Sequence, residues 1–124
     1  MNVVLWVVAA VLALAFLGAG LLKLTQPTQR LAQRGLGWVE QFPTWQVKGL
    51  GVLEILAAIG LILPAALDIA PILVPLAATG LAVVMIGAAI VHARRNEKQA
   101  IPITVVLFVL AAFLAWRRFG PDRF

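Results

Sequence analysis

The sequence predicts an all-α integral membrane protein, a bundle of four membrane-spanning helices. Of its 124 residues, 63% are hydrophobic and only 12% are charged, and the mean hydropathy is +1.03. Such a chain has too little polar surface to cover a water-exposed globule. A helix needs about 20 apolar residues to cross a hydrocarbon core of about 30 Å, so four crossings use most of the chain. We therefore expect one membrane domain over residues 1–124.

The first two predicted helices span about residues 3–24 and 47–66. The first apolar run carries no charge until Lys23. It is too long for a signal peptide, and no basic residue precedes it, so we interpret it as the first crossing. The second run is interrupted by Glu54 and carries Pro64 near its end, where a proline stops or kinks a helix.

The third and fourth predicted helices span about residues 69–92 and 101–117. The third has Pro71 and Pro75 in its first turns and gives way to the polar stretch 92–99. The fourth begins beside Pro102, a residue suited to a first helical turn, and ends before Arg117. Its length is barely sufficient to cross a bilayer.

A segment of about residues 27–42 between the first two helices has the composition of a membrane interface. Tryptophan prefers the headgroup region, so we predict that this segment lies on the membrane as a short helix from about Pro27 and turns near Pro43. Its basic and apolar residues alternate as Arg30, Leu31, Arg34, Leu36, Trp38 and Phe42.

Four crossings place both termini on one side of the membrane and the two longer loops on the other. The loop side carries more basic residues, and positive charge is retained in the cytoplasm, so the termini are expected to be extracytoplasmic. The loop-side residues are Lys23, Arg30, Arg34, Lys48, Arg94, Arg95 and Lys98, against Arg117, Arg118 and Arg123 on the terminal side.

The polar residues of the predicted helices share faces with small side chains. At about 100° per residue, Glu54 lies with Gly51, Ala57 and Ala58, whereas bulky aliphatic residues face away from it. Lys23 and His92 follow the same pattern on their own helices. The expected lipid-facing residues are Val52, Leu56, Ile59 and Leu63 on the second helix, Val3, Val7, Leu14, Leu17 and Leu21 on the first, and Leu76, Val83, Ile86 and Ile90 on the third.

These faces predict a polar pocket in the loop-side half of the bundle. Glu54 is its deepest charge, Lys23 is the expected partner, and His92 and Thr104 lie at the same level. An idle glutamate inside a membrane helix costs about 3 kcal/mol, which favours a role as a site or as a structural pair. The expected lining residues are Phe16, Gly20, Gly51, Ala58, Met85 and Phe108.

Each of these residues also has a structural interpretation. Lys23 can be a helix-end anchor, His92 an interfacial residue, and Thr104 can bond its own backbone. The small residues can serve close helix packing alone. Lys48 is a weaker partner for Glu54 and is expected to extend toward the headgroups.

Composition excludes several kinds of site. The chain has no cysteine and a single histidine, so we expect no zinc or haem site and no metal. Redox chemistry would need a borrowed cofactor, and no motif specifies one. The net charge of +5 stands at the ends of apolar runs, so membrane lipid is expected as a partner and nucleic acid is not. The pattern indicates a place for a ligand rather than a reaction.

Several of these segments together resemble the DoxX-like family of small bacterial membrane proteins. The similar segments are Gly20-Leu-Leu-Lys23-Leu24, Lys48-Gly-Leu-Gly51-Val-Leu-Glu54-Ile-Leu-Ala-Ala-Ile-Gly60-Leu-Ile-Leu-Pro64, His92 with its basic neighbours, and Arg117-Arg118-Phe119-Gly120. The resemblance covers nearly the whole chain and implies a four-helix protein of the bacterial inner membrane. The family's recurrent polar positions fall on Lys23 and Glu54.

What the resemblance implies about activity is broader. Relatives are associated with a membrane thiosulfate:quinone oxidoreductase, with redox-stress complexes or with membrane protein assembly. We therefore expect a membrane subunit or a site for a quinone or another amphiphile, with a redox subunit or a second copy as partner. The alternatives are a noncatalytic assembly or scaffold protein and, less favoured without a visible inverted repeat, a small-solute transporter.

Overall fold

The computed structural model describes residues 1–33 and 37–124. Four helices in these ranges are long and apolar enough to cross a membrane, and this confirms the predicted fold class. Two short helices, α2 and η1, lie between α1 and α3. The elements in chain order are α1 (Asn2–Thr25), α2 (Thr28–Gln33), the 3-10 helix η1 (Gly37–Gln41), α3 (Thr44–Ala66), α4 (Leu73–Arg94) and α5 (Ile101–Phe119).

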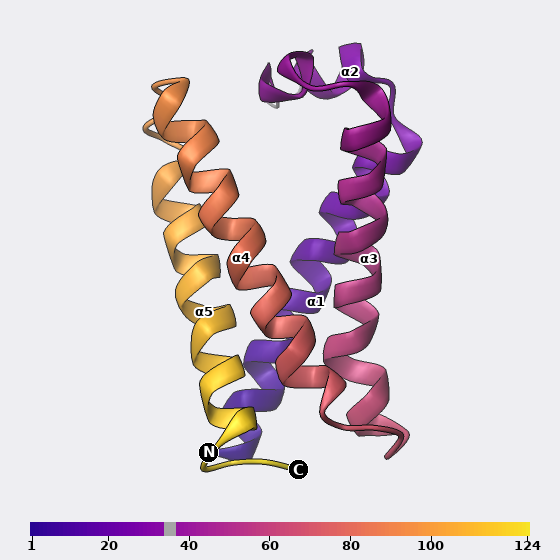
Figure 1. The fold of residues 1–124 in the computed structure, drawn as a ribbon, viewed down its shortest axis with the longest axis vertical. Helices are drawn as coiled ribbons and strands as arrows, with labels where there is room; N and C mark the ends of the chain where they lie inside the picture. Colours follow the sequence, from indigo (N-terminus) through magenta and orange to yellow (C-terminus); the bar gives the residue numbers. More distant parts are fainter. Residues whose placement is uncertain (34–36) are drawn as a thin grey trace.

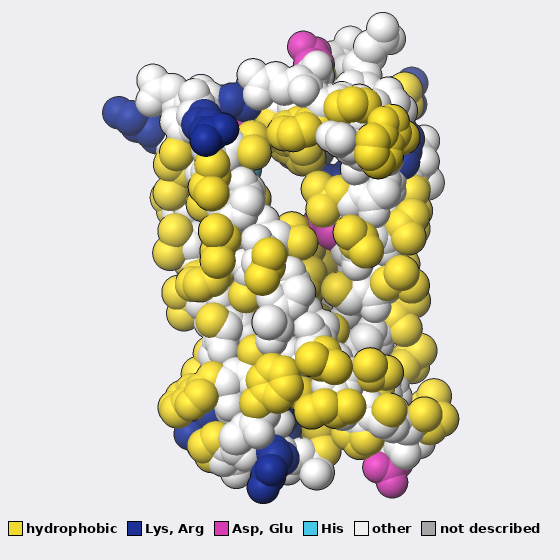
Figure 2. Space-filling model, viewed as in Figure 1, with side chains coloured by type: hydrophobic (Ala, Val, Ile, Leu, Met, Phe, Trp, Pro, Cys, Tyr) yellow, Lys and Arg dark blue, Asp and Glu magenta, His cyan; other side chains and the backbone are white. Residues whose placement is uncertain are grey.

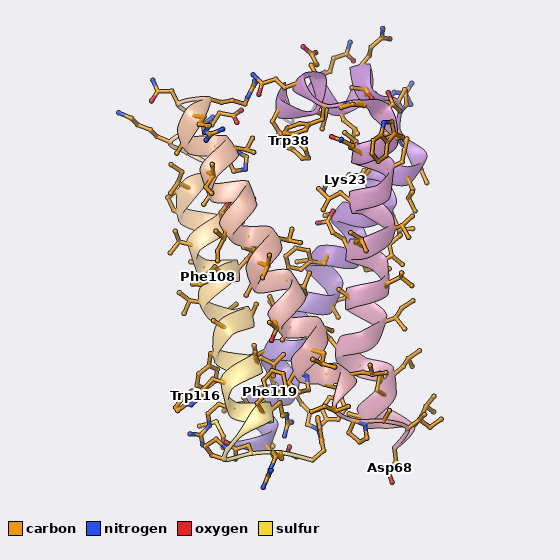
Figure 3. The ribbon with its side chains drawn as sticks, in the orientation of Figure 1. Lys23, Trp38, Asp68, Phe108, Trp116 and Phe119 are labelled. Carbon is orange, nitrogen blue, oxygen red and sulfur yellow. The ribbon has the colours of Figure 1, made fainter. Side chains whose placement is uncertain are left out.

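The four long helices form two antiparallel pairs, α1 with α3 and α4 with α5 (Figure 1). The pairs lie close together near the two chain termini and diverge toward α2 and η1. We call the first region the terminal end; it includes both termini and the α3–α4 turn, from which Asp68 projects (Figure 3). The opposite region, with α2, η1 and the α4–α5 turn, is the loop end.

An apolar core joins all four helices below the divergence. Its small residues permit close approach: a methyl group placed on Gly60 of α3 would lie 3.2 Å from Cβ of Ala77 on α4. The outward faces predicted for α1, α3 and α4 are confirmed, since all of their aliphatic residues are exposed in the isolated chain. The buried core residues are Leu5, Ala9, Leu12, Phe16, Ala58, Leu61, Ala78, Leu81, Ala82, Met85, Ala111, Leu114 and Ala115.

Two glycines set the crossing of α1 and α3. A Cβ on Gly20 would lie 2.6 Å from the carbonyl oxygen of Gly51, and one on Gly51 would lie 2.9 Å from that of Gly20. A side chain at either glycine would clash with the backbone of the other helix, so the two helices approach this closely only because both positions are glycine. This contact lies next to Lys23, whose Cβ is 3.0 Å from the position a Gly51 Cβ would take.

The helix bounds differ from the expected ones where the backbone turns. Residues 69–72, expected in the third helix, precede α4 because Asp68 and Ala70 have φ values of 55° and 47° and Pro71 follows them. Pro64 lies inside α3, which continues to Ala66. Helix α3 also begins earlier than expected, at Thr44 directly after Pro43.

The expected interfacial segment contains two short helices rather than one. Leu31 of α2 and Val39 of η1 are buried with Val47 of α3 in a small second core, which fixes this segment on the α1–α3 pair. Residues 34–36 of the segment, with Arg34 and Leu36, lie outside the described residues.

Candidate functional site

A cavity of about 420 Å³ lies between the two helix pairs at the loop end. Figure 2 shows the corresponding hollow, which opens sideways between the pairs. Its wall is mostly apolar, with a few polar groups from α1, α3, α4 and α5. The residues that line it are Ala15, Phe16, Ala19, Lys23, Trp38, Phe42, Gln46, Val47, Leu50, Glu54, Val84, Met85, Gly87, Ala88, Val91, His92, Thr104 and Leu107.

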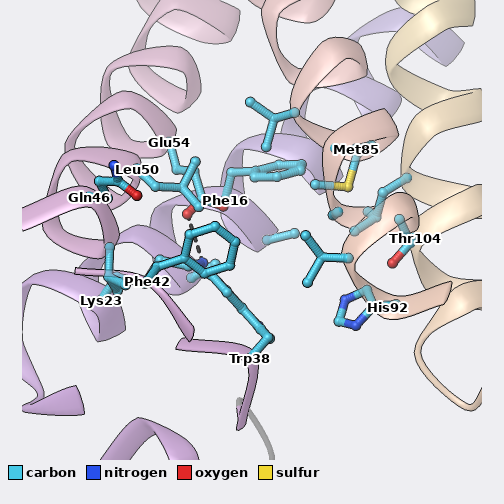
Figure 4. A pocket seen from close by; sticks show the side chains of 18 residues that line it. Phe16, Lys23, Trp38, Phe42, Gln46, Leu50, Glu54, Met85, His92 and Thr104 are labelled. Carbon is cyan, nitrogen blue, oxygen red and sulfur yellow. Dashed lines mark ion pairs between the residues drawn. The ribbon is translucent and has the colours of Figure 1, made fainter. Parts of the chain in front are cut away.

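Lys23 and Glu54 form an ion pair on the α1–α3 side of the cavity (Figure 4). Lys23 Nζ lies 2.7 Å from Glu54 Oε1, and the two residues are 6% and 3% exposed. The close crossing at Gly20 and Gly51 brings their helices within reach of each other. Each charge offsets the desolvation cost of burying the other, and either residue alone would be a buried charge without a partner.

The pair leaves hydrogen-bonding capacity unused. Among the described residues, Lys23 Nζ is the charged atom paired with the Glu54 carboxylate, through Oε1. An ammonium group carries three N–H donors, and a carboxylate can accept about four hydrogen bonds. The cavity therefore presents both a donor and an acceptor from one place.

Two aromatic residues cover this pair from the loop. Trp38 of η1 lies with its ring centroid 5.9 Å from Lys23 Nζ, a cation–π distance. Phe42 contacts Trp38 edge-on, with ring centroids 5.9 Å apart and an interplanar angle of 75°. Figure 3 shows Trp38 on the side of the loop that faces the bundle, and Figure 4 shows it beside the cavity. The two aromatic rings thus form an apolar part of the cavity wall next to the charged pair.

His92 and Thr104 lie on the opposite wall, on α4 and α5 (Figure 4). His92 Nδ1 is 3.0 Å from Glu97 Oε1. The Thr104 hydroxyl donates a 2.9 Å hydrogen bond to the Ala100 carbonyl, so the backbone bonding considered for it does occur. Its oxygen retains acceptor capacity toward the cavity.

Glu97, in the turn between α4 and α5, is a residue that sequence reasoning did not single out. The hydrogen bond with His92 lowers the pKa of the Glu97 carboxyl, with a further contribution from Arg95, whose Nε is 3.2 Å from Glu97 Oε1. Glu97 follows His92 by five residues across a helix end, where Asn96 has a φ of 60°. Helical spacing could not reveal this contact, because it depends on that turn.

The structure divides the expected lining residues into two groups. Phe16 and Met85 line the cavity, where they meet the apolar core. Gly20 and Gly51 lie instead at the α1–α3 crossing, and Ala58 is buried in the core. Phe108 borders a second, smaller hollow on α4 and α5. These four residues share faces with the polar groups but do not line the cavity.

The expectation that Lys48 extends to the headgroups is wrong. Its Nζ donates hydrogen bonds to the carbonyl oxygens of Lys23, Leu24 and Gln26, at 2.6, 3.2 and 2.7 Å. Carbonyls at a helix C-terminus have no partner within the helix, and a positive charge there also interacts favourably with the negative end of the helix dipole. Lys48 therefore joins the end of α1 to the beginning of α3 and does not compete for Glu54.

Comparisons with known proteins give one finding. The sequence model of the DoxX-like family matches residues 7–114 of the chain. No curated protein and no solved structure matches it. Within the part of the chain that the structure describes, no group of three or more His, Cys, Asp or Glu side chains could hold a metal ion.

Proposed function

The chain belongs to the DoxX-like family of multi-pass membrane proteins, and we propose that its loop-end cavity binds the polar head of an amphiphilic small molecule, with a quinone as the best-fitting class. The observation that carries the proposal is a buried ion pair, Lys23 with Glu54, that lines an apolar cavity. A merely structural pair needs no space beside it.

The size and polarity of the cavity support a small amphiphilic ligand. Its volume of about 420 Å³ lies in the usual range for small-molecule sites, which combine apolar walls with a few placed polar groups. Lys23 can donate to a ligand carbonyl oxygen, and Glu54 can accept from a ligand hydroxyl. A quinone head presents the first group when oxidised and the second when reduced.

The sideways opening supports a ligand that arrives from the membrane. The hollow opens between the helix pairs, whose outward faces are aliphatic (Figure 2). A lipid-soluble molecule can therefore enter without leaving the hydrocarbon region, and its apolar tail can remain between the pairs. Trp38 and Phe42 offer flat surfaces on which a ring can stack.

Quenching of Trp38 fluorescence by decylubiquinone tests the proposal in detergent-purified protein. Trp38→Phe should remove the saturable part of the quenching, whereas Trp45→Phe should retain it, since Trp45 is 71% exposed and does not border the cavity. Glu54→Gln and Lys23→Met should each weaken binding about tenfold, the loss of one charged hydrogen bond. Asp68→Asn, at the far end, is the matched control. Unchanged affinity in folded Glu54→Gln and Lys23→Met proteins would refute the site.

A scaffold role is the second candidate, and the Gly20–Gly51 contact favours it. This contact adjoins the ion pair, so Lys23 and Glu54 could serve only to hold α1 on α3. Lys23→Met combined with Glu54→Gln would then preserve folding and the cellular phenotype. The quinone proposal expects the same double variant to fold but to lose decylubiquinone binding.

We also propose that the loop end faces the cytoplasm and that both termini are extracytoplasmic. The loop end carries more Lys and Arg in the sequence, and such residues are retained on the cytoplasmic side. Because the chain has no cysteine, single cysteines report the orientation directly. A membrane-impermeant maleimide should label Asp68→Cys in intact cells and label Lys98→Cys only after lysis; the reverse pattern would invert the topology.

A further inference from the structure

A cluster of three residues adjoins the cavity on the side away from the ion pair. Glu97 Oε1 lies 3.0 Å from His92 Nδ1 and 3.2 Å from Arg95 Nε, so one carboxylate oxygen bridges both. His92 lines the cavity, whereas Glu97 and Arg95 belong to the α4–α5 turn. The cluster therefore connects the inside of the cavity with the surface of the loop end.

The contact with Glu97 gives the two nitrogens of His92 different roles. An ionised carboxylate only accepts hydrogen bonds, so the nitrogen beside it carries a proton. A neutral imidazole has one N–H, and with Nδ1 occupied in this way Nε2 has the free lone pair. Sites that use histidine as a ligand or a proton carrier commonly fix the ring by this kind of carboxylate contact.

Arg95 forms an ion pair with the same carboxylate. Its Nη2 lies 2.9 Å from the position that a Cβ on Gly37 would occupy, so the guanidinium reaches from the α4–α5 turn to η1. The absence of a side chain at Gly37 permits this approach. Arg95 thus links the turn that carries Glu97 to the short helix that carries Trp38.

The charged groups that face His92 come from the α4–α5 turn and from helices α1 and α3. Arg95 and Glu97 contact each other and lie on the turn, while Lys23 and Glu54 face it from α1 and α3 across the cavity. Helix α5 contributes the uncharged Thr104. Glu97 is therefore the acidic group in contact with the imidazole among the described residues.

We propose that Glu97 is a positioning residue of the cavity: it holds Nδ1 of His92, presents Nε2 to the bound ligand, and serves as the contact through which His92 exchanges protons with water at the loop end. The inference rests on the proposed function for the identity of the ligand. The imidazole accepts a proton from a ligand hydroxyl at Nε2, which leaves the ligand as its anion, and the resulting imidazolium releases its Nδ1 proton through the Glu97 carboxylate to water. The imidazole is then neutral with its proton on Nε2, and it returns to the Nδ1–H form when, after the ligand leaves, Nε2 loses its proton to water and Nδ1 regains one through Glu97.

The single histidine of the chain makes a direct test possible. Protein labelled with ¹⁵N-histidine gives one imidazole, whose nitrogen shifts at pH 8.5 report which nitrogen carries the proton. Wild type should show the Nδ1–H tautomer. Glu97→Gln should give a mixture with Nε2–H, and Glu97→Asp should restore Nδ1–H at least in part. Glu40→Gln, the same change at an exposed site on η1, should resemble wild type.

This measurement needs no ligand, so it separates the inference from the proposed function. If Glu97→Gln leaves the tautomer unchanged, or wild type holds the proton on Nε2, the positioning role is overturned even where decylubiquinone binds. If the tautomer responds as expected but decylubiquinone does not bind, the proposed function fails and the arrangement of His92 stands.

Binding of decylubiquinol tests the contact at Nε2 itself. His92→Phe should weaken decylubiquinol binding severalfold through the loss of one hydrogen bond, and Glu97→Gln should weaken it as well while Glu40→Gln does not. Equal decylubiquinol affinities in wild type, His92→Phe and Glu97→Gln would overturn the proposal.

Discussion

Among the described residues, the loop end buries the basic side chain of Lys23 and the terminal end that of Arg118, but the two surround it differently. At the terminal end Arg118 is 4% exposed and donates to Asn2 Oδ1 and to the Asp122 carbonyl, both at 2.9 Å. The ring of Phe124 lies 3.9 Å from its Cζ. At the loop end Lys23 is as deeply buried, but it faces Glu54 across the edge of a cavity.

The contrast separates a structural charge from a candidate site. Arg118 contacts groups from both ends of the chain and does not line the cavity. Lys23 has a charged partner and a cavity of about 420 Å³ beside it. An unpartnered buried atom occurs at both ends, at Arg118 Nε and at Glu54 Oε1, so the adjoining cavity is what distinguishes the loop end.

Removing Lys23 should have the largest effect on stability. Lys23→Met leaves Glu54 buried without an opposite charge and should lower the free energy of unfolding by about 3–5 kcal/mol. Adding Glu54→Gln removes the orphaned charge and should recover most of that loss. Denaturation in mixed micelles measures both. Equal stabilities of the single and double variants would show that the pair carries no net charge coupling.

Arg118→Met should have the next largest effect. It removes two charge-assisted hydrogen bonds that join α5 to Asn2 and to the C-terminal residues, so we expect a loss of about 2–3 kcal/mol. Decylubiquinone affinity should stay within about twofold of wild type, because the terminal end does not contact the cavity. Arg123→Met, at an exposed position, is the control. A large loss of ligand binding in Arg118→Met would contradict the division between the two ends.

Two alanine substitutions in α1 sharpen the comparison further. A methyl group at Gly20 would lie 2.6 Å from the Gly51 carbonyl oxygen and 2.7 Å from the Ile55 side chain. A methyl group at Gly18 would have no such neighbour within 4 Å among the described residues. Gly20→Ala should cost about 1–2 kcal/mol through overpacking, and Gly18→Ala should gain up to about 1 kcal/mol from helix propensity. Thermal unfolding in one detergent compares them. A stabilised Gly20→Ala protein would mean that the α1–α3 crossing adjusts easily.

The smallest expected effect concerns acid. Because the pKa of Glu97 in the folded protein is below its ordinary value of 4.5, its contact with His92 stabilises the fold above that value and is lost as pH falls through the folded pKa. The melting temperature of wild type should therefore fall slightly more than that of Glu97→Gln between pH 5 and pH 3. Parallel decreases in the two proteins would argue against any net contribution from this contact.

The sequence was sufficient for the fold class and for the outward faces, because hydrophobic length and helical periodicity determine both. The aliphatic residues opposite Glu54, such as Leu56 and Ile59, are exposed as the 100° spacing predicts. The same spacing identified Lys23 and Glu54 as inward-facing, and the structure brings them within 2.7 Å of each other.

The remaining features depend on how helices meet and end, which periodicity does not report. Gly20 and Gly51 share a face with the polar pair, yet they lie at a helix crossing rather than at the cavity. Trp38 reaches the cavity because a second small core holds η1 on α3. Glu97 reaches His92 through a turn with a left-handed residue, Asn96. The first of these contacts depends on how two helices cross, and the other two depend on the three-dimensional path of a loop or turn.

The bond between Lys48 and the end of α1 bears on how the chain enters a bilayer. Lys48 follows Lys23 by 25 residues in the sequence, and Glu54 lies within two helical turns of Lys48. A nascent chain synthesised as far as Pro64 therefore already contains the carboxylate that pairs with Lys23 and the ammonium group that bonds the last carbonyls of α1. A translocating α1–α3 hairpin can thus neutralise Lys23 and saturate its last carbonyls before α4 and α5 are synthesised. The polar contacts of Lys23 and of the C-terminal carbonyls of α1 thus lie within the α1–α3 pair.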